Sequence, residues 1–88
     1  MKANFKELKV MMDFEGEPVT LDIRHALGNA IRRSTADIGV DETARKIYFS
    51  DGEVELPDEH ADAIRAVAAK TFVVPVQQAV EEELKVKS

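Results

Sequence analysis

The side chains of this sequence that are best suited to binding chemistry are three arginines, Arg24, Arg32 and Arg33. They fall in a segment with helical periodicity, in which residues four apart share one face. Arg24, Gly28 and Arg32 would therefore stack, and a glycine between two arginines leaves room for a close-approaching phosphate. Guanidinium groups bind phosphate oxygens, so the segment predicts a nucleic-acid surface.

Charge and composition make that surface the less favoured interpretation. The 88 residues include 12 basic and 17 acidic side chains, a formal net charge of −5, and nucleic acids are also anionic. Asp22, Asp37 and Glu42 lie near the arginines in the sequence and can pair with them. No aromatic residues alternate with the arginines, as they do in many single-strand binders. We therefore expect a solvated, ion-paired helix face, with nucleic-acid association as the alternative function.

Patterns for catalysis and metal binding are weak. The chain has two histidines, His25 and His60, and no cysteine. His60 has acidic neighbours at positions 58, 59 and 62, but helical neighbours must be three or four residues apart to meet. The serines have no histidine close to them in the sequence. We therefore expect no enzyme activity, no metal site and no cofactor.

A stripe of apolar side chains at helical spacing follows the C-terminal segment and consists of Phe72, Val76, Val80 and Leu84. One interpretation is an exposed surface for a protein partner or for a second copy of the chain. The other is that the stripe completes the core, because four phenylalanines, one tyrosine and no tryptophan leave a mostly aliphatic interior. The two interpretations are nearly balanced, with the core slightly favoured.

The hydrophobic period changes at Asp22. This change predicts a strand pair that leads into a helix, and these elements would position the candidate side chains. Before it, alternating apolar residues predict a strand over residues 5–14, a turn at 15–17 and a returning strand over 19–23. After it, helical spacing predicts a helix from Ile23 to Ser34 with Asp22 as its N-cap. The side chains expected to face inward are Leu8, Val10, Met12, Phe14, Val19, Leu21, Ile23, Ala26, Leu27, Ala30 and Ile31.

The rest of the chain leaves two alternatives open. Residues 41–56 suit either a hairpin around an Asp-Gly turn or, as we favour, a short helix at 41–47 followed by a strand at 54–56 on the sheet edge. Pro75 interrupts a strongly helical C-terminal region. It predicts either one kinked helix or, as we favour, two helices at 57–71 and 75–85.

Together these elements predict an α+β fold in one small domain spanning residues 1–88, in which an N-terminal antiparallel hairpin packs against three to four helices. No apolar run is long enough for a signal peptide or a membrane span, so we expect a cytoplasmic protein without membrane contact. The function we expect is that of a small non-enzymatic accessory or protein-interaction module. Its partner, or a second copy, would bind the C-terminal helix.

Overall fold

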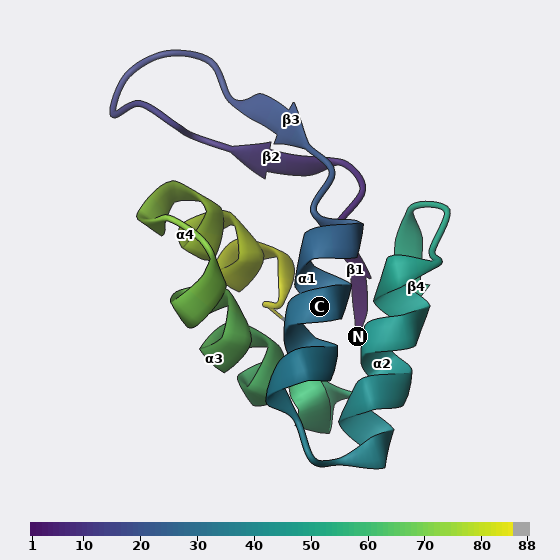
Figure 1. Ribbon diagram of the computed structural model, residues 1–88. Helices are drawn as coiled ribbons and strands as arrows, with labels where there is room; N and C mark the ends of the chain where they lie inside the picture. Colours follow the sequence, from purple (N-terminus) through teal and green to yellow (C-terminus); the bar gives the residue numbers. More distant parts are fainter. Residues whose placement is uncertain (86–88) are drawn as a thin grey trace.

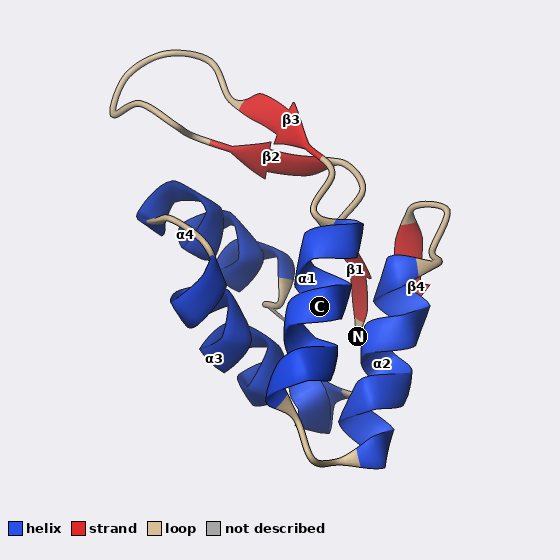
Figure 2. Ribbon diagram, viewed as in Figure 1, coloured by secondary structure: helices blue, strands red, loops and turns tan. Residues whose placement is uncertain are grey.

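The computed structural model describes residues 1–85 and has the α+β architecture that the sequence predicts. Within these residues, two separate two-stranded antiparallel sheets accompany four α-helices (Figure 1; Figure 2). The helices form one group, and the two sheets lie against different parts of it (Figure 2). The predicted hairpin is one of these sheets, and the other was not predicted.

The N-terminal hairpin pairs β2 (Leu8–Val10) with β3 (Val19–Leu21). Its register places Leu8 opposite Leu21 and Val10 opposite Val19, which confirms the predicted antiparallel pairing. The strands are much shorter than the predicted 5–14 and 19–23. The chain runs on from Val10 as an exposed loop that extends beyond the helices (Figure 1). Strand structure therefore ends where the chain moves away from the helices (Figure 1).

The second sheet joins the two ends of a long stretch of chain, pairing β1 (Lys2–Asn4) with β4 (Glu53–Glu55). Ala3 lies opposite Val54, and Ala3 is buried. The predicted strand at 54–56 exists one residue earlier, but its neighbour is β1 rather than the hairpin edge. Strand β1 has only three residues and a single small buried side chain, so it shows almost no hydrophobic periodicity. It was therefore not predicted.

The first helix, α1 (Arg24–Ser34), begins one residue later than predicted. Ile23 occupies the N-cap position, and the Asp22 carboxylate instead accepts a hydrogen bond of 3.1 Å from the backbone N–H of Arg24. Ala26, expected to face inward, is exposed, whereas Gly28, expected to face outward, is buried. The inward face is rotated toward α2, the helix that packs most extensively against α1.

Helix α2 (Ile38–Tyr48) settles the ambiguous middle of the chain in favour of a helix, which begins three residues earlier than predicted. Asp37 sets that start, since its carboxylate accepts from the backbone N–H groups of Gly39 and Val40. The close packing of α1 on α2 depends on Gly28. A Cβ atom added there would lie 3.0 Å from the carbonyl oxygen of Ala44 and 3.0 Å from the Cβ of Tyr48.

The C-terminal region forms two helices, as the interruption at Pro75 predicts. A short 3₁₀ turn (Asp58–His60) leads into α3 (Ala61–Thr71), and α4 (Val74–Glu83) follows. Pro75 lies in the first turn of α4, where a missing backbone N–H breaks no helical hydrogen bond. No helix within residues 1–85 is long and apolar enough to cross a membrane.

Candidate functional site

The C-terminal apolar stripe lies largely in the core and not on the surface. Val76, Val80 and Leu84 are 6%, 0% and 1% exposed, and Phe72 is partly buried against the same core cluster. Helix α4 packs against both α3 and β2, so its apolar side is covered within the chain. An exposed partner surface made of these side chains is therefore wrong for this structure, and their role in it is packing.

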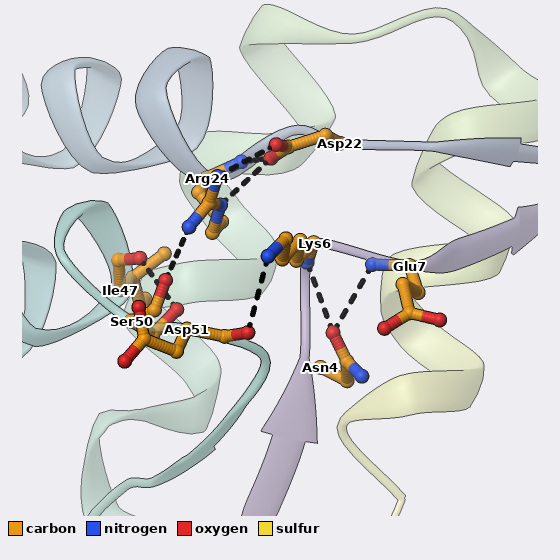
Figure 3. Close-up of polar contacts among 8 residues, drawn as sticks. All are labelled: Asn4, Lys6, Glu7, Asp22, Arg24, Ile47, Ser50 and Asp51. Carbon is orange, nitrogen blue, oxygen red and sulfur yellow. Dashed lines mark hydrogen bonds and ion pairs between the residues drawn. The ribbon is translucent and has the colours of Figure 1, made fainter.

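Arg24 is held inside a polar cluster rather than facing solvent (Figure 3). Its guanidinium makes two hydrogen bonds to Asp22, from Nη2 at 2.8 Å and from Nε at 3.0 Å, and Nη1 donates to the carbonyl of Ser50. Nearby, the Lys6 ammonium donates to the Asp51 carbonyl at 3.4 Å. These bonds tie the root of the hairpin to the turn after α2, so Arg24 is engaged structurally.

This cluster predicts a specific acid sensitivity. Hydrogen bonding from Arg24 lowers the pKa of Asp22 from 3.8 to about 2. The ionised carboxylate therefore stabilises the fold above its unfolded pKa, and that stabilisation is lost as pH falls through the folded value. In urea unfolding between pH 5 and pH 2, Asp22→Asn should lose less stability on acidification than the wild type. Asp13→Asn, on the exposed loop, should keep the wild-type pH dependence, and equal slopes for all three proteins would contradict the prediction.

The other two predicted arginines do lie on the surface. Arg32 is exposed and pairs with Asp41 on α2, with 3.2 Å between Nη1 and Oδ2. Arg33, the next residue, is also exposed. The buried Gly28 packs against α2 and offers no approach for a phosphate group. The structure thus leaves two of the three arginines accessible, and one of those two is already paired with a carboxylate.

Between the outer sides of α1 and α2 lies a hollow of about 320 Å³, here called the α1–α2 groove. Gly28 and Ala44, where α1 packs tightly on α2, form part of its lining. The larger and polar side chains of the groove are Asn29, Arg32, Asp41, Arg45, Tyr48 and Phe49. It therefore combines two guanidinium groups, one carboxylate and two aromatic rings.

The aromatic rings of the groove are ordered by their neighbours. Tyr48 stacks on the His25 ring with centroids 4.2 Å apart, and it meets Phe49 edge-on at 4.8 Å. The Arg45 guanidinium carbon lies 5.8 Å from the centre of the Phe49 ring. Such a cation–π contact leaves the charge available to solvent. Tyr48 and Phe49 lie at the C-terminal end of α2, whereas His25 belongs to α1. Helical spacing relates only residues within one helix, so sequence reasoning missed the contact between them.

A second surface feature is the end of the hairpin, residues 11–19, here called the hairpin tip. Four of the eight exposed large apolar side chains in residues 1–85 belong to it, namely Met11, Met12, Phe14 and Val19. Sequence alternation placed Met12, Phe14 and Val19 on the buried face. That expectation is wrong, because these side chains are exposed. The loop that follows β2 extends away from the helices (Figure 1).

The hairpin tip is acidic as well as apolar. Its charged residues are Asp13, Glu15 and Glu17, and no basic residue lies between positions 11 and 19. Gly16, at the turn, has φ of +128°, a conformation that residues with a side chain rarely adopt. The tip thus presents apolar and acidic side chains around a turn that depends on glycine.

Neither surface can be interpreted through a relative, because no family model, curated protein or solved structure matches this chain. The α1–α2 groove and the hairpin tip differ in charge and in shape. The groove is concave and lined by two arginines, whereas the tip is convex and acidic. They also lie far from each other in Figure 1, since the loop between β2 and β3 extends away from α2.

Metal dependence remains a prediction with a direct test. Within residues 1–85, no three His, Cys, Asp or Glu side chains gather closely enough to hold a metal ion. Neither a chelator nor added zinc should therefore shift the melting temperature, because only a ligand that binds the folded state stabilises it. A shift of several degrees in either direction would show that metal ligands had been overlooked.

Proposed function

We propose that this protein is a small non-enzymatic module that binds another protein through its hairpin tip. The observation that supports this function is the exposure of Met11, Met12, Phe14 and Val19 together on one projecting element. Single exposed apolar residues are ordinary on protein surfaces, but a cluster of them marks an interaction site. Phe14 extends fully into solvent and is the natural anchor, since aromatic residues dominate binding energy at interfaces.

The form of the tip suits docking better than catalysis. It is convex, so it offers no enclosed site in which a substrate could be held away from water. A β-hairpin is instead suited to insertion into a partner's groove or to pairing along an edge. The methionines support the same function, because their flexible side chains adapt to irregular apolar surfaces.

The test is a photo-crosslinking amino acid placed at position 14. In cells that express the tagged protein, we expect discrete cross-linked protein adducts that disappear when Met12 is also replaced by serine. The same amino acid at Glu59, an exposed position in the 3₁₀ turn away from the tip, is the matched control. If position 14 gives no adduct, or the same adducts as position 59, the tip is not a binding element.

A further inference from the structure

We propose that the hairpin tip of one copy of this protein docks into the α1–α2 groove of a second copy. This inference rests on the proposed function and names the partner as the same chain. It joins the two surface features that packing within one chain leaves unused.

The shapes of the two surfaces are complementary. The groove is about 320 Å³, within the range of pockets that accept small organic groups, and the tip presents Phe14 as a fully exposed ring. Within the groove, Tyr48 and Phe49 provide aromatic faces and edges against which a third ring can pack. Phe49 is itself 69% exposed, so docking would cover apolar surface on both copies.

The charges of the two surfaces are opposite. The tip has Asp13, Glu15 and Glu17 around its apolar residues, and the groove presents the guanidinium groups of Arg32 and Arg45. Asp41 neutralises part of the charge of Arg32, but no ion pair within residues 1–85 engages Arg45. In a chain with a net charge of −5, the overall charge repels an acidic tip. The groove is a place where that tip meets positive charge.

The placement of the two surfaces requires a second copy. The loop between β2 and β3 extends away from α2, so the tip cannot fold back into the groove of its own chain (Figure 1). The contact is head-to-tail, so an assembly that does not close into a ring has a free tip at one end and a free groove at the other. A tip of nine residues covers less than the ~800 Å² per partner of a stable interface, so the association is weak and depends on concentration.

Sedimentation equilibrium from ~10 µM to ~1 mM at low salt tests the proposal, because small interfaces associate in that range. We expect the average mass of the wild type to rise past that of a dimer and to fall when salt is added. Phe14→Ser and Arg45→Glu should each weaken association by ~10-fold or more. Both positions are exposed, so circular dichroism should show that both variants stay folded.

Mixing the two variants gives the decisive result. Phe14→Ser keeps an intact groove and Arg45→Glu keeps an intact tip, so an equal mixture should form dimers that cannot extend. A wild type that stays monomeric throughout the range would overturn the proposal. So would a symmetric dimer that neither substitution affects, or a mixture no more associated than each variant alone.

Other occupants of the groove give different outcomes. If the wild type is monomeric but cross-links to a different protein through position 14, the proposed function stands and the self-association does not. If the wild type is monomeric and binds a single-stranded oligonucleotide, and Arg45→Glu abolishes that binding, the groove is a nucleic-acid site and the proposal is wrong. If every adduct at position 14 joins two copies of this chain, and the wild type associates through the tip and groove, the partner is confined to the same chain.

Discussion

Replacing both Val80 and Leu84 with lysine is expected to unfold the protein at room temperature. The two side chains are 0% and 1% exposed, and each ammonium group would be buried without a partner. Such burial costs several kcal/mol per charge, whereas a domain of this size has roughly 5 kcal/mol of stability to lose. Circular dichroism should show the loss of the cooperative thermal transition.

The matched control is Gln78→Lys, which adds the same charge to an exposed position of the same helix. It should change the free energy of unfolding by less than ~0.5 kcal/mol. A double variant at positions 80 and 84 that melted like the wild type would mean that α4 does not pack on the core in solution. The stripe would then again be a candidate partner surface.

Replacing Gly28 with valine should have the next largest effect. Any Cβ at this position meets the Ala44 carbonyl and the Tyr48 Cβ at 3.0 Å, and the carbonyl belongs to backbone that cannot rotate away. Two further methyl groups would force α1 and α2 apart, at a cost of about 2 kcal/mol or more. Urea denaturation should show a lower midpoint with an unchanged slope.

Two further variants serve as controls for the valine substitution. Gly28→Ala should be much milder, because a gain in helix propensity of up to ~1 kcal/mol offsets part of the close contact. Asn29→Ala, at the next and exposed position, should cost little. If valine at position 28 were as mild as alanine at position 29, the two helices would not approach as closely as the structure shows.

The sequence predicts the helical part of the fold well because amphipathic periodicity is a local property. Helix α1 is displaced by one residue, and the break between α3 and α4 follows from the restrictions that Pro75 places on the backbone. Alternation also identified the hairpin. It could not give the length of the strands, since the apolar pattern continues to Phe14 whereas burial ends at Val10.

The surfaces were harder to predict because they depend on contacts between distant parts of the chain. The stripe of Val76, Val80 and Leu84 shows that one face of the helix is apolar, but periodicity does not say whether β2 and α3 cover that face. The α1–α2 groove is likewise assembled from two helices. Arg32 and Tyr48 are 16 positions apart, and the packing of α1 on α2, which is tight at Gly28, brings them to one groove.

The pairing of β1 with β4 has a consequence for the order in which the protein folds. Lys2 lies opposite Glu55, so β1 has no strand partner until β4 has been synthesised. Helices α1 and α2 are separated by three residues and can associate long before that point. Closing a long loop costs more entropy than closing a short one, so the helical pair forms early and the N-terminus docks late. During synthesis the residues of β1 thus leave the ribosome well before those of β4, yet they are among the last to reach their native positions.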